Sequence, residues 1–337
     1  MTAKANKTHG VAVLGCGDMG RGHARAWNDR PDSRVTAVFD VDTARAQALA
    51  ADTGAEVHNS WQAAIEADGV DMVSVCTPIC FHAEMAIHAA RCGRHVLCEK
   101  AMALTLTDAD AMIAAAATAS VKLVIAYQHR AFPVHRTWQS LIRRNLLGGP
   151  LFIRMEDVRG IRPKTAMHRR GMNGGPVIDM AGHFFDLVRY YTGAEPMRVT
   201  AHGHCFGRSK PELSSFQDLA IDAAEILVEY SGGHVLSANL NWGLPAGHPG
   251  STRMCISSPE VVSVPLDNRI SVRHKDREEI YDPVPGIEGT AKRIDDLVRS
   301  TEDDTRPEVA GEDGRVALAV CLAALQSIES GKTEPLA

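Results

Sequence analysis

VAVLGCGDMG, residues 11–20, is the stretch that decides the fold. It opens with an apolar run, Val11–Leu14, that predicts a buried strand, and it continues into the turn Gly15-Cys-Gly17-Asp-Met-Gly20, which a helix-like segment follows. Glycines at these three positions let the chain turn tightly, let the backbone approach a pyrophosphate, and let the helix pack closely on the strand. The order of strand, glycine turn and helix predicts a dinucleotide-binding βαβ unit.

An acidic residue completes this pattern at the end of the next apolar run. The run Val35–Phe39 predicts a second strand, and Asp40 follows it, 20 residues after Gly20. A carboxylate at this place accepts hydrogen bonds from the hydroxyls of an adenosine ribose and repels a 2′-phosphate. The nearest following cation is Arg45, and Asp42 adds negative charge beside it, so the sequence favours NAD over NADP as the cofactor.

The first part of the chain alternates short β-rich runs with amphipathic segments, which predicts a parallel sheet with helices on both faces. The other expected strands are Glu56–His58, Met72–Cys76, His95–Cys98 and Lys122–Ala126, and the helix-like stretches include Thr43–Asp52, His82–Arg91 and Asp108–Ala119. Residues 1–128 are therefore expected to form an NAD-binding α/β domain of the Rossmann type, with a doubly wound parallel sheet.

After Tyr127 a helical pattern over Pro133–Leu146 precedes longer runs that alternate in polarity, as antiparallel strands with one solvated face do. The expected strands are Leu151–Val158, Val199–Phe206, Ile221–Tyr230, His234–Trp242, Arg253–Ser258 and Ile270–His274, and helical spacing returns over Gly286–Arg299 and Gly311–Ser330. Residues 129–337 are expected to form an α+β domain with a large, mainly antiparallel sheet. This domain is expected to bind substrate and to mediate oligomerisation, with its last helix packed back on the body of the fold.

Composition excludes several classes of protein. With 45% hydrophobic and 23% charged residues, the 337-residue chain matches ordinary globular proteins, and its length suits two domains. A formal net charge of -5 provides no basic field for nucleic acid, and no apolar run suits a signal peptide or a membrane span. The eight cysteines never form a Cys-x-x-Cys pair, which predicts reduced thiols, no metal site and a cytoplasmic protein.

Two further motifs, together with the glycine turn, resemble the glucose-fructose oxidoreductase, inositol dehydrogenase and MocA (GFO/IDH/MocA) family over nearly the entire chain. The first, VCTPICFHAEMAIHAARCGRHVLCEKAMALT from residue 75, matches the family's Thr-Pro and Glu-Lys-Pro motifs at Thr77-Pro78 and Glu99-Lys100, with Ala101 in place of the last proline. The second, GGPVIDMAGHFFD at residues 174–186, matches the Asp-x-x-x-His pattern of the family's catalytic helix.

The residues of the second motif also carry an expectation of their own. Asp179, His183 and Asp186 stand at i, i+4 and i+7, which places them on one face of a single helix. A histidine that is neutral at pH 7 suits proton removal from a hydroxyl, and a neighbouring carboxylate orients the ring or holds another substrate hydroxyl. His183 is the expected base and Asp179 that carboxylate. Lys100, at the carboxyl end of the fifth strand, is the expected donor to the reacting oxygen.

The glycine turn, Asp40 and the family motifs define the expected cofactor-binding residues. They are Gly15, Gly17, Asp18, Met19, Gly20, Asp40, Thr77, Pro78, His82, Glu99, Lys100 and Gln128. A basic segment before the catalytic helix, together with the domain junction, provides the expected substrate-binding residues, which are Arg130, Arg154, His168, Arg169 and Arg170. Arginine binds carboxylate, sulfonate or phosphate through paired hydrogen bonds, which indicates an anionic sugar or sugar acid. A solvated or subunit-contact loop is the alternative.

The motifs and the resemblance imply an NAD-dependent oxidoreductase that acts on a secondary alcohol of a sugar, sugar acid or cyclitol. Two alternatives share the cofactor domain. One is an NAD-dependent glycosidase that uses transient oxidation and elimination, and the other is a non-catalytic dinucleotide-binding regulatory protein. The resemblance also implies a homodimer or homotetramer, with no nucleic-acid or membrane partner.

Overall fold

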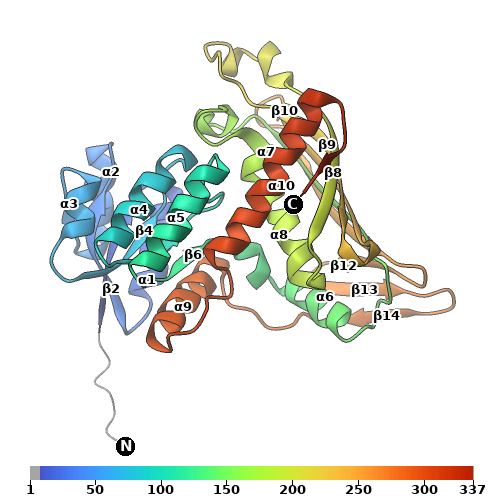
Figure 1. Ribbon diagram of the computed structural model, residues 1–337, viewed down its shortest axis with the longest axis horizontal. Helices are drawn as coiled ribbons and strands as arrows, with labels where there is room; N and C mark the ends of the chain where they lie inside the picture. Colours follow the sequence, from blue (N-terminus) through green and yellow to red (C-terminus); the bar gives the residue numbers. More distant parts are fainter. Residues whose placement is uncertain (1–7, 337) are drawn as a thin grey trace, which may run out of the picture. The chain divides into compact units, whose positions relative to one another are not determined.

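The structure, a computed structural model, describes residues 8–336 and divides into two compact units (Figure 1). The first unit comprises the chain up to residue 128 together with residues 288–315, and the second comprises residues 129–287 and the chain from residue 316 onward. The return of 288–315 to the first unit departs from the expected single division at residue 128. This segment belongs to the first unit because Ile294, Leu297 and Val298, on the apolar face of α9 (Gly289–Glu302), complete the core that surrounds Val11.

The first unit is built on a parallel sheet in the order β3-β2-β1-β4-β5-β6, which confirms the doubly wound fold. Its strands are β1 (His9–Leu14), β2 (Ser33–Phe39), β3 (Glu56–Val57), β4 (Val70–Val75), β5 (His95–Cys98) and β6 (Leu123–Ile125). Its helices besides α9 are α1 (Asp18–Asn28), α2 (Thr43–Thr53), α3 (Trp61–Glu66), α4 (His82–Arg91), α5 (Leu106–Thr118) and the 3-10 turn η1 (Ile79–Phe81). All six residues of β1 are buried, as a central strand with helices on both faces requires.

The second unit is built on a nine-stranded sheet in the order β14-β13-β12-β11-β7-β10-β9-β8-β15. The strands are β7 (Phe152–Gly160), β8 (Pro196–His204), β9 (Ala223–Tyr230), β10 (Val235–Leu244), β11 (Ser251–Ser257), β12 (Val262–Leu266), β13 (Arg269–Arg273), β14 (Glu278–Tyr281) and β15 (Glu334–Pro335). Every pairing is antiparallel except that of β7 with β10, so the mainly antiparallel sheet is confirmed.

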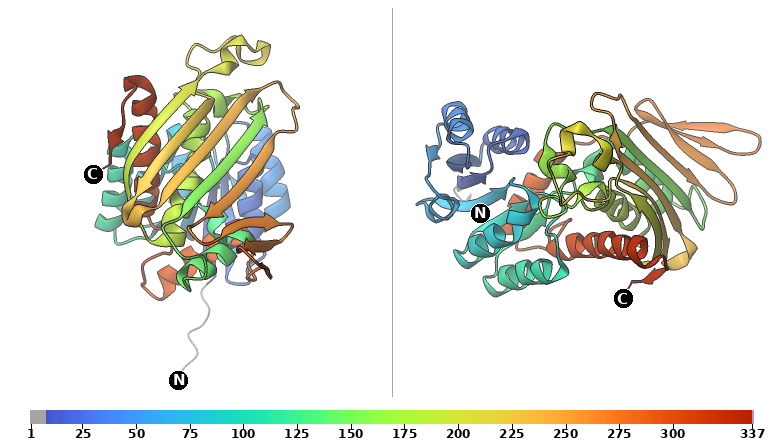
Figure 2. Two further views of the ribbon diagram at one scale, coloured as in Figure 1. Left: turned by 90° about the vertical axis from the view of Figure 1, so that its right-hand side faces the viewer. Right: turned by 90° about the horizontal axis from the view of Figure 1, so that it is seen from above.

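Helices accompany one face of this sheet. They are α6 (Pro133–Arg143), α7 (Gly175–Asp179), α8 (Ala181–Thr192) and the greater part of α10 (Gly311–Ser330), with 3-10 turns η2 (Gln128–Ala131), η3 (Thr165–His168), η4 (Phe206–Ser209), η5 (Pro211–Leu213) and η6 (Ser231–Gly233). Both α7 and α8 contact β10. Alternate residues of β7, such as Ile153, Met155 and Asp157, are buried on this face, while Arg154 lies on the opposite, open face, which faces the reader in the left view of Figure 2.

Among the described residues, no helix has both the length and the apolar character that crossing a bilayer demands.

Candidate functional site

The turn between β1 and α1 is shaped by close backbone contacts. Gly15 has φ +89°, and a Cβ there would lie 2.8 Å from the carbonyl oxygen of Cys76. A Cβ on Gly20 would lie 1.8 Å from the carbonyl oxygen of Gly15, a distance that no side chain tolerates. At Gly17, by contrast, nothing lies within 4 Å of an added Cβ. Two glycines therefore close the turn, and the third leaves its outer side open to a ligand.

Among the described residues, the first turn of α1 has no side-chain cap, unlike the first turns of α2, α3 and α5. Asp42, Ser60 and Thr105 cap α2, α3 and α5 by accepting backbone N–H bonds, whereas Gly17 provides no side chain at the start of α1. The N–H groups of a first turn have no partner within the helix, and the helix dipole favours an anion beside them. The turn therefore fits a dinucleotide's pyrophosphate.

Asp40 connects the end of β2 to this turn. Its Oδ2 accepts the Cys16 N–H at 2.7 Å, and its Oδ1 accepts the Asp42 N–H at 2.8 Å. Asp42 also pairs with Arg45, whose Nε lies 3.1 Å from the carboxylate. The Arg45 cation is thus paired with Asp42, the residue that caps its own helix, while the Asp40 carboxylate contacts the glycine turn.

His82 connects the two loops that carry the expected Thr77-Pro78 and Glu99-Lys100 motifs. Its ring is buried, with Nε2 2.9 Å from the Thr77 carbonyl oxygen and Nδ1 2.9 Å from the Ala101 carbonyl oxygen. Burial lowers the pKa of His82, although both carbonyls oppose that shift. Since both ring nitrogens contact backbone carbonyl oxygens, the geometry favours a structural role in which His82 holds these two loops together.

His23, on α1, is fully buried and joins the turn's helix to β4 and β5. Its Nε2 lies 3.0 Å from Glu99 Oε1, and its Nδ1 lies 3.2 Å from Ser74 Oγ. Burial alone would lower the pKa of His23, but the Cys76 thiol and the Glu99 carboxylate raise it to about 10. The pKa of Glu99 is lowered, because the contact with His23 outweighs burial. The two side chains form a buried ion pair.

This ion pair reaches the backbone of Lys100. Glu99 Oε2 accepts the Lys100 N–H at 3.2 Å, and the peptide from Lys100 to Ala101 is cis. The carboxyl ends of β1, β2, β4, β5 and β6 lie at one edge of a parallel sheet, so the first unit gathers the expected cofactor residues there.

In the second unit the expected catalytic helix is interrupted. Asp179 is the last residue of α7 and His183 the third of α8, with Met180 (φ -107°, ψ -46°) between the two helices. The His183 N–H bonds to the Met180 carbonyl, an i to i+3 contact, at 3.0 Å. The prediction that Asp179, His183 and Asp186 share one face of a single helix was therefore wrong.

His183 stacks on His129, a contact that the sequence did not indicate. The ring centroids are 3.9 Å apart and the planes differ by 11°. His129 is also stacked on His135, at 5.8 Å, and His135 Nδ1 lies 2.5 Å from the Tyr191 hydroxyl. Burial, together with the charge of His129, lowers the pKa of His135 to about 3. The stack fixes the plane of the His183 ring.

Of three expected substrate-binding arginines, two are paired with carboxylates and one lies on the open face of the sheet. Arg130 is buried in a two-pronged ion pair with Asp186, at 2.8 and 2.5 Å. Arg169 Nε lies 2.9 Å from Asp218. Arg154 lies on the open face of the sheet, opposite the face that α7 and α8 cover.

Of the other two, Arg170 is exposed and His168 is buried. Burial and the nearby Arg162 lower the pKa of His168, while the Asp179 carboxylate opposes the shift. The turn η3, which ends at His168, contacts α7, which ends at Asp179. The structure therefore brings His168 and Asp179 together, whereas Arg154 lies on the opposite face of the sheet.

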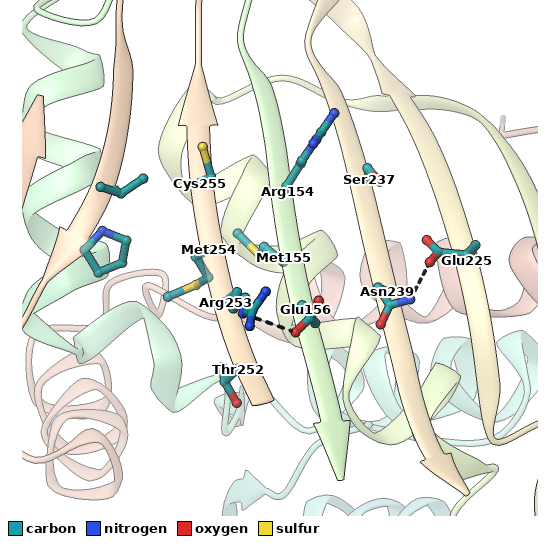
Figure 3. A pocket seen from close by; sticks show the side chains of 12 residues that line it. Arg154, Met155, Glu156, Glu225, Ser237, Asn239, Thr252, Arg253, Met254 and Cys255 are labelled. Atoms are coloured by element: carbon teal, nitrogen blue, oxygen red, sulfur yellow. Dashed lines mark hydrogen bonds and ion pairs between the residues drawn. The ribbon is translucent and has the colours of Figure 1, made fainter. Parts of the chain in front are cut away.

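Arg154 lines a groove of about 620 Å³ on the open face (Figure 3). Within it Arg253 approaches Glu156, and Asn239 donates to Glu225, so its charges of both signs are interleaved. The groove is lined by Arg154, Met155, Glu156, Glu225, Ser237, Asn239, Thr252, Arg253, Met254, Cys255, Val264 and Pro265. Phe152 and Leu227 are exposed on the same face. Self-association stays a prediction.

Family models match both parts of the chain. A model described as an oxidoreductase family with an NAD-binding Rossmann fold matches residues 9–127. A model of the GFO/IDH/MocA C-terminal domain matches residues 135–260.

Individual relatives extend over most of the chain. Inositol 2-dehydrogenase of Rhizobium meliloti is 25% identical over 323 residues, which are 94% of this chain and 96% of the relative. UDP-N-acetylglucosamine 3-dehydrogenase of Acidithiobacillus ferrooxidans is 28% identical over 86% of this chain and 83% of its own length. The crystal structure of an aldose-aldose oxidoreductase from Caulobacter crescentus, complexed with glycerol, superposes with a TM-score of 0.84 and 25% identity, covering 98% of this chain and all of its own.

Proposed function

The chain belongs to the GFO/IDH/MocA family of NAD-binding oxidoreductases, and on that premise we propose that it interconverts a secondary alcohol and a ketone on a sugar, sugar acid or cyclitol. The observation that carries the proposal is the uncapped first turn of α1 beside the Asp40 carboxylate, which fits a dinucleotide. The substrate class is supported by the relatives, which are named for inositol, a nucleotide sugar and aldoses.

The reaction divides into a hydride transfer and a proton transfer. When bound, the nicotinamide ring supplies the hydride acceptor or donor. His183, its ring plane held by His129, takes the hydroxyl proton during oxidation and returns it during reduction. Asp179 holds a substrate hydroxyl or orients the base, and Lys100, its backbone held by Glu99, donates to the reacting oxygen.

Absorbance of NADH tests this function directly. We expect the purified protein to produce NADH from NAD and at least one member of a panel of sugars, sugar acids and cyclitols. A matching panel of aryl glycosides is run in parallel. Release of the aglycone without net NADH would contradict net oxidation and indicate a glycosidase, and the absence of both signals would leave a non-catalytic binding protein.

The cofactor is proposed to be NAD, because a carboxylate at the end of β2 is expected to repel a 2′-phosphate. Asp40→Ser is expected to shift the ratio of kcat/KM for NAD to that for NADP by about tenfold or more toward NADP, since the repelling charge is lost. Steady-state kinetics with both cofactors measure the ratio. Asp52→Ser, which removes the same charge from an exposed position of α2, is the matched control. An unchanged ratio in Asp40→Ser is incompatible with this role.

A further inference from the structure

Among the described residues, the basic segment between β7 and α7 contains two arginines without an acidic partner, the exposed Arg170 and the partly buried Arg162. Arg159 is neutralised by Asp157, with contacts of 2.7 and 2.6 Å, and Arg169 by Asp218. Among the described residues, Arg162 forms no ion pair, although it is partly buried. A partly buried guanidinium with its hydrogen-bond donors uncommitted is the group most suited to receive an oxyanion.

Arg162 is nevertheless held in place. Its Cζ lies 5.8 Å from the centre of the Trp242 ring, a cation-π contact. Trp242 is buried, and its Nε1 donates to Asp157 Oδ1 at 2.7 Å, which fixes the indole. Stacking of this kind positions the guanidinium while leaving its five N–H donors available.

His168 adds a second group that lacks a partner. The backbone N–H of Arg162 donates to His168 Nε2 at 3.0 Å, so in the neutral ring the proton lies on Nδ1. That Nδ1 is buried and has no hydrogen-bond partner in the part of the chain that the structure describes, and the whole residue is only 2% exposed. Buried N–H groups of this kind are rare in folded proteins unless a ligand or water satisfies them.

The two groups lie beside the residues already assigned to the substrate. The His168 ring is edge-on to Trp242, at 6.3 Å, so Arg162 and His168 contact the same indole. His168 also ends the turn η3, which contacts α7, the helix that ends at Asp179. Arg162 and His168 therefore form a donor pair next to the carboxylate proposed to hold a substrate hydroxyl.

We propose that Arg162 and His168 select a substrate that carries an oxyanion, the carboxylate of a sugar acid. Arg162 binds the two carboxylate oxygens, and His168 Nδ1–H donates to an adjacent substrate oxygen. Trp242 is the positioning residue that holds both. This inference rests on the proposed function, and it narrows the substrate from sugars in general to sugar acids.

The test compares a sugar acid with its neutral parent, for example a hexuronate with the hexose of the same configuration, and includes the hexose phosphate as a third arm. Wild-type protein is expected to prefer the acid in kcat/KM. Arg162→Gln is expected to lower kcat/KM for the acid by about tenfold to 100-fold, mainly through KM, and to change that for the neutral sugar less than threefold. Arg162→Lys is expected to restore part of the loss, because it keeps the charge without the fork.

Arg208→Gln is the matched control, since it removes an exposed arginine of the same unit that forms no ion pair among the described residues. Thermal stabilisation of each variant by the sugar acid gives a readout that needs no turnover. A wild-type preference for neutral sugars or for the phosphate, or equal losses for acid and neutral sugar in Arg162→Gln, would overturn the inference. If no sugar gives NADH but the acid stabilises wild type and not Arg162→Gln, the proposed reaction fails while the oxyanion site stands.

Discussion

Replacement of His183 by asparagine is expected to lower kcat for sugar oxidation by about 10²- to 10⁴-fold, the usual contribution of a general base. Asparagine retains a polar side chain of similar size but does not accept a proton at neutral pH. Binding of NADH is expected to change less than threefold, because the cofactor turn belongs to the other unit. Stopped-flow absorbance gives the rate, and quenching or enhancement of NADH fluorescence gives the cofactor affinity.

His202→Asn is the matched control, because His202 is exposed on β8 in the same unit. It is expected to keep the wild-type rate. His129→Phe is a second comparison, since it preserves an aromatic ring beside His183. Full activity in His183→Asn, or an equal loss in His202→Asn, would assign the base to another residue.

Replacement of Glu99 by alanine is expected to lower the free energy of unfolding by about 3–5 kcal/mol, because it leaves the buried His23 without its counter-charge. The loss includes the hydrogen bond to the Lys100 N–H. Urea unfolding followed by tryptophan fluorescence measures the difference, with NAD absent from all samples.

The ion pair of His23 and Glu99 also makes the free energy of unfolding depend on pH. The pKa of His23 is raised from 6.5 to about 10 in the folded protein, so its contribution to stability is complete below about pH 6.5 and declines as the pH rises through 10. The pKa of Glu99 is lowered from 4.5, so its contribution is complete above about pH 4.5 and declines as the pH falls. The advantage of wild type over a neutral pair is therefore greatest between these limits.

The double variant His23→Gln, Glu99→Gln provides that neutral pair with hydrogen-bonding groups retained. It is expected to be more stable than Glu99→Ala and to lack the decline between pH 6.5 and 10. A loss below 1 kcal/mol in Glu99→Ala, or a double variant that follows the wild-type pH curve, would contradict a buried ion pair.

The sequence was most informative at positions where the local backbone geometry restricts the choice of residue, as in the glycine turn. Gly15 and Gly20 predicted the turn after β1 because a Cβ at either position would collide with backbone, and the resulting fold is confirmed. Hydrophobic periodicity located the strands of the first unit to within two residues. It missed β12, β14 and β15 in the second unit, which are short and partly exposed strands, with Pro265 inside β12.

What the sequence could not provide were contacts between distant residues. Arg130 and Asp186 are 56 positions apart, and Arg169 and Asp218 are 49 apart, so nothing local distinguished these paired arginines from Arg162. The stack of His183 on His129 and the return of residues 288–315 to the first unit are likewise contacts between residues that are distant in the sequence. The break at Met180 was missed for another reason, because the spacing of Asp179 and His183 is equally compatible with one helix and with two short ones.

Asp40 has a consequence for attempts to change the cofactor by engineering. The carboxylate proposed to distinguish NAD from NADP also accepts the Cys16 N–H inside the glycine turn. Substitution at this one position therefore alters both the charge proposed to face the ribose and a hydrogen bond that supports the glycine turn. A successful switch to NADP must replace the two contributions separately, with a cation for the added phosphate and a new acceptor for the Cys16 amide. The proposed specificity and the structure of the turn therefore depend on the same carboxylate.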